Sequence, residues 1–395
     1  MIADGGPLVA VAEGVMAFGR PPFGPRRRPC ERRRAGARRA TARRACVAAL
    51  LWASVAGSAC APQGGDEWAE SELRGEIFGT TWSVKVVGRE PLREEALIDL
   101  RLAISEELEG IDAEMSTWRD DSDLMRFNAS SGTEPVPVPE RFAEVLALSL
   151  DVWRSSGGAF DVTVGPLVEL WGFGRARALG RTPSLPDERT LAELRPAVGS
   201  RLLELERRPD GSATLRKLDP RVQVDLSAVA KGYAVDRVLE RSADLGHTDV
   251  LVEIGGEIAA IGLNRERQPW VLAIERPIPG ARAVQRLLRV TSPVALATSG
   301  DYRNFYIVEG RRYTHTLDPR SGRPVSHDGA SVSVLAENCA TADAWATALL
   351  ALGPDEGHAL AEELGLAALF LIHGDGDDVT AVEERTTTAF DLLAH

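Results

Sequence analysis

The chain has 395 residues, of which 44% are apolar, and a formal net charge of −12 at pH 7. A chain of this length and composition can bury a large core, either as one large domain or as two closely associated ones. The charge is unevenly distributed, because residues 1–45 carry eleven arginines against three acidic residues. The remainder is therefore about −20, which argues against nucleic acids and anionic lipid surfaces as partners.

The first 60 residues have the composition of an export signal. The arginine-rich segment precedes a short apolar run, 45–59, that ends in small residues before Cys60. This run is too short to span a bilayer as a stable helix. A basic flank, a short apolar core and a cysteine at the cleavage point predict a lipoprotein signal with a lipid anchor at Cys60. Ordinary cleavage nearby is the alternative, because Gly57 stands where leucine or valine is usual.

Removal of this signal would leave only two cysteines, Cys60 and Cys339, so no disulfide framework is expected. The small, largely apolar neighbours of Cys339 favour a buried residue over a catalytic thiol. Residues 61–72 are polar and predict a tether, and residues 73–395 predict the folded domain.

The folded region combines strand and helix patterns. Alternating apolar and polar residues over 75–88 predict two strands with a turn around Gly79. Apolar residues at helical spacing predict long helices over 92–115 and 139–155. Further along, we expect strands near 202–205, 250–254, 270–273 and 287–290, and helices near 231–245 and 340–352. Short turns join many of the strands, so the pattern predicts an α+β fold with mixed or antiparallel sheets flanked by helices, in two closely associated subdomains.

Polar residues and glycines interrupt these elements at several points. Trp118 lies in a loop rich in Asp and Ser, which is either an ordinary turn after a helix or a platform for a ligand. Asp161 lies in an apolar run flanked by glycines. Because buried carboxylates need partners, Asp161 either caps the following segment or binds the polar edge of a heterocycle. The pair Gly255–Gly256 follows a strand, as in a tight turn or a close approach to a ligand.

Residues 224–240 predict a strand that ends in Asp225, a cap at Ser227 and a helix that begins with Lys231. A helix N-terminus presents free N–H groups and a positive dipole, which suits a pyrophosphate. Lys231 would add a full positive charge at the same end. The segment therefore predicts a phosphate-binding site.

The densest polar cluster lies in residues 297–325. His315 stands there between two threonines on a strand-like run, where it is either structural or one half of an acid–base pair with Asp318. In a later predicted helix, Asp343 and Thr347 are four residues apart and share one face. Such a pair either holds a hard cation such as Mg²⁺ through oxygen ligands or forms a hydrogen bond along the helix.

Several segments of this chain, in this order, resemble the ApbE family of FAD:protein FMN transferases over residues 75–372. The matching segments are GTTWSVK, MSTWRDDSDLMRFN, GAFDVTVGPLVELWGFG, VDLSAVAKGYAVD, IGGEIAAIG, TSGDYRNFY, THTLDPRSGRPV and ADAWATALLALGP. The resemblance implies an ApbE-like fold and a flavin transferase. Two positions depart from the family pattern, because Phe78 stands where methionine is frequent and Thr314 replaces the usual serine.

The resemblance also implies site residues, position by position. The implied FAD contacts are Phe78, Trp118, Ala159, Phe160, Asp161, Asp225, Lys231 and Leu317. The implied Mg²⁺ ligands are the carbonyl group of Ala228 and the side chains of Asp343 and Thr347. His315 matches the family histidine that assists phosphoryl transfer, so it is the expected catalytic residue.

The implied reaction is Mg²⁺-dependent attack by a threonine or serine hydroxyl of another protein on the FMN phosphorus of FAD, with release of AMP. The implied acceptors are membrane redox subunits on the export side. The enzyme is therefore expected in the periplasm, anchored to the inner membrane. Two alternatives stay open: an FAD pyrophosphatase that releases free FMN and AMP, and an FAD-binding lipoprotein without activity. Metal ligands at Asp343 and Thr347 speak against the second.

Overall fold

The computed structural model describes residues 10–12, 67–175, 185–278, 282–291, 293–302, 304–374 and 381–394. Cys60 and most of the predicted signal and tether lie outside these residues. Strand β2 begins at Ala69, so the last residues of the predicted tether 61–72 belong to a strand, because they pair with β3. Within the described ranges, no helix is both long and apolar enough to cross a membrane.

An eight-stranded sheet forms the centre of the fold, and all of its strand pairs are antiparallel. Two of its hairpins turn on residue pairs with positive φ, Phe78–Gly79 and Gly255–Gly256, as two-residue hairpin loops require. The predicted turn at Gly79 is confirmed. Of the two alternatives for Gly255–Gly256, the structure shows a tight turn. In spatial order the strands are β18 (Val382–Thr386), β17 (Ala367–His373), β16 (Gly329–Ala336), β11 (Val294–Gly300), β8 (Glu257–Ile261), β7 (Val250–Ile254), β3 (Thr80–Gly88) and β2 (Ala69–Ile77).

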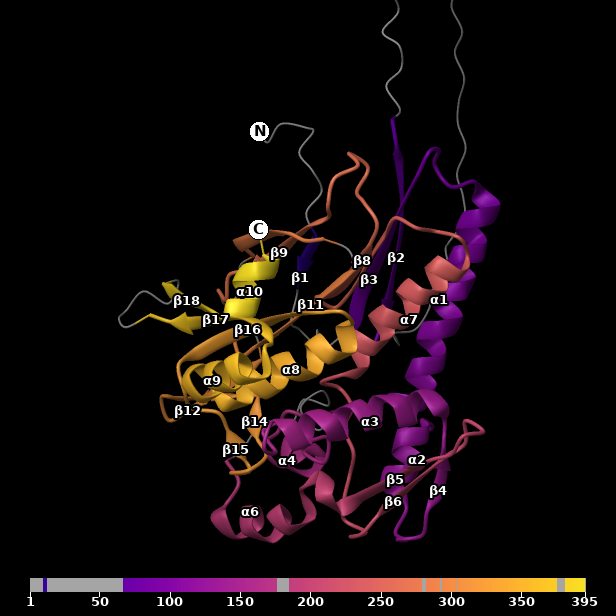
Figure 1. The fold of residues 1–395 in the computed structure, drawn as a ribbon. Helices are drawn as coiled ribbons and strands as arrows, with labels where there is room; N and C mark the ends of the chain where they lie inside the picture. Colours follow the sequence, from indigo (N-terminus) through magenta and orange to yellow (C-terminus); the bar gives the residue numbers. More distant parts are fainter. Residues whose placement is uncertain are drawn as a thin grey trace, which may run out of the picture.

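Helices cover one face of this sheet. Figure 1 shows α7 (Ala230–Asp244) and α8 (Cys339–Leu352) side by side beneath the sheet, with α1 (Glu94–Met115) packed against α7. A Cβ atom on Gly232 would lie 2.4 Å from the carbonyl oxygen of Cys339. Glycine at this position therefore allows the close approach of α7 and α8 on which the site below depends.

Further helices and a small sheet pack around the eight-stranded sheet. The edge helix α9 (Pro354–Leu364) follows α8. On the opposite face of the sheet, an apolar cluster that includes Trp270 and Leu272 packs against Leu251 and Ile258. The elements near this face are β1 (Ala10–Ala12), β9 (Val271–Glu275), β10 (Val284–Arg289) and α10 (Thr388–Leu393).

A second part of the fold lies on the far side of α7 and α8 (Figure 1). Its three-stranded sheet runs in the order β4 (Val136–Val138), β6 (Ala213–Lys217), β5 (Leu203–Arg207). Its helices are α2 (Asp123–Ala129), α3 (Glu140–Ser155), α4 (Gly165–Leu170), α6 (Glu188–Leu194) and the 3₁₀ turns Arg195–Ala197 and Ser200–Leu202. One continuous core contains residues of both parts, so the prediction of an α+β fold is confirmed.

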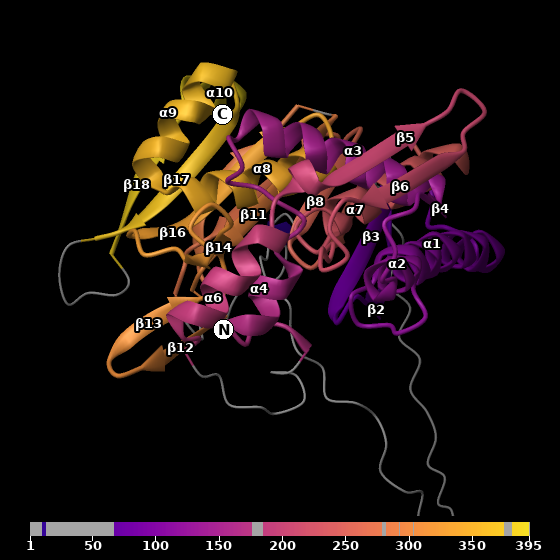
Figure 2. The same ribbon diagram turned by 90° about the horizontal axis from the view of Figure 1, so that it is seen from below.

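Two short hairpins lie between the two parts: β12 (Phe305–Val308) with β13 (Arg311–Thr314), and β14 (Leu317–Asp318) with β15 (Arg323–Pro324). Figure 2 shows the first of them beside α4 and α6. The rings of Phe173 and Tyr306 stack here with centroids 5.0 Å apart. These contacts fix the segment that carries His315 against the segment after α4.

The predicted strand before Lys231 is wrong. Residues around Asp225 form no strand in the structure. The side-chain amide of Asn128 binds both backbone groups of Val224, and the backbone N–H of Asp225 donates to the carbonyl oxygen of Val162. The predicted cap at Ser227 is also wrong, since α7 begins at Ala230 and Val229 occupies its N-cap position without a side-chain bond. The other predicted elements are present, with ends shifted by a few residues.

Candidate functional site

Two adjoining pockets lie where the two parts of the fold meet α7. The larger has a volume of about 190 Å³ and the smaller about 50 Å³, and Ser227 and Lys231 line both. Every site residue expected from the sequence lines one of them. The larger pocket is lined by Ala159, Phe160, Asp161, Asp225, Ala228, Lys231, His315, Leu317, Asp343 and Thr347, and the smaller by Phe78, Trp118 and Lys231.

Lys231 is held between two buried carboxylates. Its Nζ lies 2.5 Å from Oε1 of Glu257, which is 1% exposed, and Asp343 is also buried. Burial opposes the charge on Lys231, but the carboxylates of Glu257 and Asp343 outweigh it and raise the pKa of the amine. Burial raises the pKa of both carboxyl groups, an effect that Lys231 partly offsets. The group therefore holds one more potential negative charge than positive charge.

The oxygen atoms around this group suit a hard cation. Oε2 of Glu257 is buried and has no hydrogen-bond partner among the described residues. Thr347 Oγ1 lies 2.9 Å from Ser299 Oγ, and Ala228 lines the same pocket. In the described part of the chain, no three His, Cys, Asp or Glu side chains group into a metal site. A carbonyl, a hydroxyl and a carboxylate, with a buried oxygen left unpaired nearby, nevertheless fit Mg²⁺, which prefers few protein ligands and keeps several waters.

Asp343 has a second task at the start of α7. Its Oδ2 accepts a hydrogen bond of 3.0 Å from the backbone N–H of Gly232. In return, Asp236 in α7 accepts bonds of 2.7 and 2.8 Å from the N–H groups of Cys339 and Ala340, at the start of α8. Each helix thus supplies the acceptor for the other's orphan donors, which fixes the relative position of Lys231 and Asp343.

The carboxylate of Asp161 accepts four hydrogen bonds from neighbouring residues. It accepts bonds of 2.6 Å from Thr163 Oγ1 and 2.7 Å from Ser200 Oγ, and it also accepts from both backbone N–H groups. Of the two alternatives for Asp161, the structure shows local bonding to the following segment. The carboxylate holds this wall of the pocket in place, and Ala159 and Phe160 line the pocket beside it.

His315 follows β13 directly. Its backbone N–H donates to the carbonyl oxygen of Asn304 at 3.1 Å, and its Nδ1 lies 3.2 Å from the same oxygen. A carbonyl can only accept, so Nδ1 carries the proton in the neutral ring and Nε2 is the basic nitrogen. Of the two alternatives for His315, a pair with Asp318 is not seen among the described contacts: the Asp318 carboxylate binds Arg320 at 3.0 Å.

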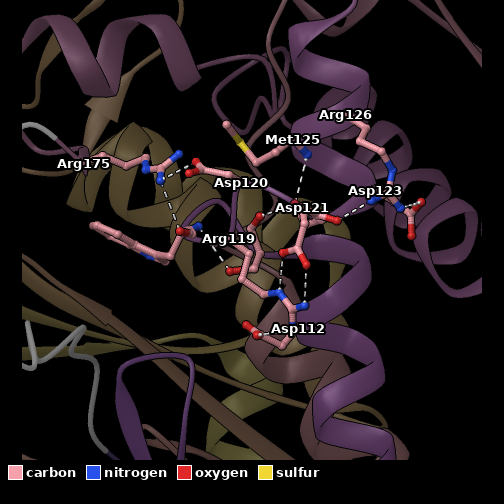
Figure 3. Close-up of polar contacts among 11 residues, drawn as sticks. Asp112, Arg119, Asp120, Asp121, Asp123, Met125, Arg126 and Arg175 are labelled. Atoms are coloured by element: carbon pink, nitrogen blue, oxygen red, sulfur yellow. Dashed lines mark hydrogen bonds and ion pairs between the residues drawn. The ribbon is translucent and has the colours of Figure 1, made fainter. Parts of the chain in front are cut away.

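Trp118 lies in a loop that ion pairs hold from two sides (Figure 3). Arg119 binds Asp121 at 3.0 Å and Asp112 of α1 at 3.3 Å. From the segment after α4, Arg175 binds the Asp120 carboxylate at 2.7 Å and the Trp118 carbonyl at 3.3 Å. The tryptophan is 37% exposed at the smaller pocket. This anchored loop therefore presents an aromatic side chain to a ligand in the smaller pocket.

Two residues of the site were not found from the sequence. Glu257 is the first residue of the strand EIAAI, and a charged residue at the head of an otherwise apolar, buried strand is the signal that could have identified it. Asp236 lies in the middle of an amphipathic helix. Its role depends on the packing of α8, which the local pattern does not contain.

Comparison with known proteins agrees with this geometry. Residues 78–370 match the model of the ApbE family. The chain is 36% identical over 333 residues to the FAD:protein FMN transferase of Klebsiella pneumoniae, a match that covers 83% of this chain and 93% of the relative. It is 39% identical over 327 residues to the protein of the same name from Haemophilus influenzae, covering 81% and 90%.

Solved structures match over the same range. The flavin transferase ApbE from Vibrio cholerae superposes with a TM-score of 0.73 and 36% identity, covering 82% of this chain and 99% of that one. The apo form of the Pseudomonas stutzeri flavinyl transferase ApbE superposes with a TM-score of 0.72 and 36% identity, covering 83% and 98%. The chain therefore belongs to the ApbE family.

Proposed function

We propose that this chain transfers the FMN half of FAD onto a threonine or serine hydroxyl of an acceptor protein, with Mg²⁺, and releases AMP. One observation carries the proposal: Lys231, at the start of α7, lines both pockets. FAD consists of two ring systems joined by a pyrophosphate. A ring on each side would bring the phosphates to the lysine and to the positive end of the helix dipole. The names of the curated relatives support the same reaction.

The chain's own residues supply the parts of a phosphoryl transfer. Ala228, Asp343 and Thr347 would hold the metal, which neutralises charge on the phosphate oxygens when bound. Lys231 and the first turn of α7 stabilise the same charge, usually the main contribution in such reactions. The acceptor hydroxyl attacks the FMN phosphorus, the bond to the bridging oxygen breaks, and AMP leaves with that oxygen. Nε2 of His315 takes the hydroxyl proton, which ends on the AMP phosphate.

An FAD pyrophosphatase would use the same site with water as the nucleophile. Mass spectrometry of a threonine-containing acceptor protein, incubated with the full chain, FAD and Mg²⁺, separates the two reactions when AMP release is followed in parallel. We expect the acceptor to gain the mass of one FMN for each AMP released. AMP with free FMN and no adduct on any acceptor would instead identify a pyrophosphatase, and FAD binding with neither product would identify the carrier.

Export and anchoring are also part of the proposal. The basic segment, the apolar run 45–59 and Cys60 are typical of a lipoprotein signal. We propose that the enzyme is anchored through Cys60 to the inner membrane, faces the periplasm and modifies membrane redox subunits there. Metabolic labelling with a fatty acid should mark the wild-type chain but not a Cys60→Ala variant. Equal labelling of both would reject the anchor and leave the transferase proposal untouched.

A further inference from the structure

A larger pocket, which the proposed reaction does not use, adjoins the FAD site. Its volume is about 730 Å³ and four arginines line it: Arg154, Arg195, Arg201 and Arg320. We call it the arginine pocket. Among the described residues of its lining, only Asp161 is acidic. Its carboxylate is buried and already accepts bonds from Thr163 and Ser200. The lining is therefore strongly basic in a domain that is otherwise acidic.

Two of these arginines form no ion pair with a carboxylate in the part of the chain that the structure describes. Arg320 binds Asp318 and Glu356, and Arg154 binds Asp151. Arg195 donates to the Arg320 carbonyl at 2.9 Å and Arg201 to the Val198 carbonyl at 3.2 Å. Throughout the described ranges, neither of these two guanidinium groups comes within ion-pair distance of an acidic side chain. Their bonds to carbonyl groups fix their positions while leaving their charge for an external anion.

The arginine pocket adjoins the larger of the two site pockets. Asp161 and Pro319 line both the arginine pocket and the larger of the two site pockets. Pro319 and Arg320 lie in the turn between β14 and β15, a few residues after His315. The backbone at this end is also accessible, because Gly157 has open space where a Cβ would be. A chain bound here would lie beside the phosphoryl-transfer centre.

We propose that the arginine pocket docks an acidic segment of the acceptor protein, next to the hydroxyl that receives FMN. This inference rests on the proposed transferase activity and names the chemistry by which the acceptor is recognised. An acidic segment is repelled by most of a domain with a net charge of about −20, so a local basic pocket both attracts it and sets its position. Arg195 and Arg201 supply forked donors that match carboxylates.

Direct binding tests the proposal without any reaction. The probes are two short fluorescent peptides, one with a threonine flanked by aspartates and one with asparagines in their place, added to the full chain at low salt. Anisotropy should show about tenfold tighter binding of the aspartate peptide. An Arg195→Glu/Arg201→Glu variant should lose this preference, whereas Arg207→Glu, an exposed arginine in β5, should keep it. The arginine-rich N-terminal segment is common to all variants, so its effect cancels.

Kinetics test the same residues in the transfer reaction. In the double variant we expect the KM for an acidic acceptor to rise about tenfold, with less than a twofold change in the KM for FAD. Arg195→Lys/Arg201→Lys should recover most of the loss, because the charge is kept. Flavin fluorescence on FAD addition confirms that each variant is folded and binds FAD.

Three outcomes would overturn the proposal. The two peptides could bind equally, the double variant could keep its preference, or AMP could displace the aspartate peptide through the arginines, which would make the pocket a nucleotide site. Binding that follows the prediction while no acceptor gains FMN would instead reject the transferase activity. The two failures are therefore distinguishable.

Discussion

The ammonium group of Lys231 lies 2.5 Å from the carboxylate of Glu257, a side chain that is 1% exposed. Asp343 is buried as well, and the carboxylates of Glu257 and Asp343 both raise the pKa of the Lys231 amine. Removal of one partner from a buried ion pair leaves an uncompensated charge, which is more costly than removal of the whole pair.

We therefore expect Lys231→Met to lower the free energy of unfolding by about 3–5 kcal/mol. Adding Glu257→Gln should restore part of this loss, because the substitution removes one of the two charges left unpaired. Denaturant unfolding of the wild type, both single variants and the double variant gives the coupling energy. If the losses in unfolding free energy of the two single variants simply add in the double variant, Lys231 and Glu257 do not stabilise the fold as an ion pair.

Substitutions of Asp343 separate its two tasks. Asp343→Asn keeps an oxygen that can accept from the N–H of Gly232 but removes the charge expected to hold Mg²⁺. We expect Asp343→Asn to remain folded yet to lose the rise in melting temperature that Mg²⁺ should give the wild type. Asp343→Ala should in addition be less stable without metal, by about 1–3 kcal/mol. An Asn variant stabilised by Mg²⁺ as strongly as the wild type would remove Asp343 from the metal site.

The contact of His315 with the Asn304 carbonyl suggests a pair of variants for the proposed base. In His315→Asn the amide can still donate to this carbonyl, but no basic nitrogen remains. We expect the kcat for FMN transfer to fall by about 10²–10⁴-fold in both His315→Asn and His315→Ala. FAD binding, measured by flavin fluorescence, should change little in His315→Asn. Full activity in the Asn variant would mean that His315 acts only as a structural donor.

Phe78 has a φ of 53° in the turn between β2 and β3, a conformation that costs an L-residue about 1–2 kcal/mol. Both Phe78→Ala and Phe78→Gly remove the ring from the smaller pocket, but only glycine relieves the strain. We expect the glycine variant to be more stable than the alanine variant by about 1 kcal/mol. Both should raise the KM for FAD by the same factor. Different KM values would indicate that the turn, and not the ring, governs FAD binding.

Asp236 predicts a pH dependence of stability. Burial raises its pKa from 3.8 to about 6, against the hydrogen bonds from Cys339 and Ala340, which lower it. The folded state holds the proton of Asp236 more tightly than the unfolded state does. The contribution of this carboxyl group to the free energy of unfolding is therefore full below about pH 4 and is lost as the pH rises through about 6. The difference between the two pKa values corresponds to ~3 kcal/mol.

Asp236→Asn should therefore flatten the fall in unfolding free energy between about pH 4 and pH 7. Asp244→Asn, an identical change at an exposed position at the end of α7, should leave the pH profile as it is. Denaturant unfolding across this pH range measures both. Parallel profiles for the wild type and Asp236→Asn would contradict the raised pKa.

Much of the fold could be predicted from periodicity, because α1, α3 and α7 each bury an apolar face that repeats at helical spacing. Helix α8 is instead apolar and buried nearly all round. The segment before Asp225 was predicted as a strand, but both backbone groups of Val224 bind a side chain from α2, Asn128, and not a neighbouring strand. A local pattern contains no information about a partner that is distant along the chain.

Only some of the site residues could be predicted from the sequence. The positions of Asp343 and Thr347 on one helix face follow from helix geometry alone, and the structure places both at the pocket. Glu257 and Asp236 depend on the packing of α7 against α8 and the sheet. For His315 the sequence left a pair with Asp318 open as one of two alternatives, whereas the observed contact is the Asn304 carbonyl group across a hairpin.

The reciprocal hydrogen bonds between α7 and α8 have a consequence for the order in which this protein is made. Gly232 and Asp343 are separated by 111 residues, and α8 begins only at Cys339. When α7 has emerged from the ribosome, Asp343 has not yet been synthesised, so the N–H of Gly232 in the first turn of α7 still lacks this acceptor. The N-terminal end of α7 is therefore assembled late, and a chain truncated before α8 should contain Lys231 but no functional site.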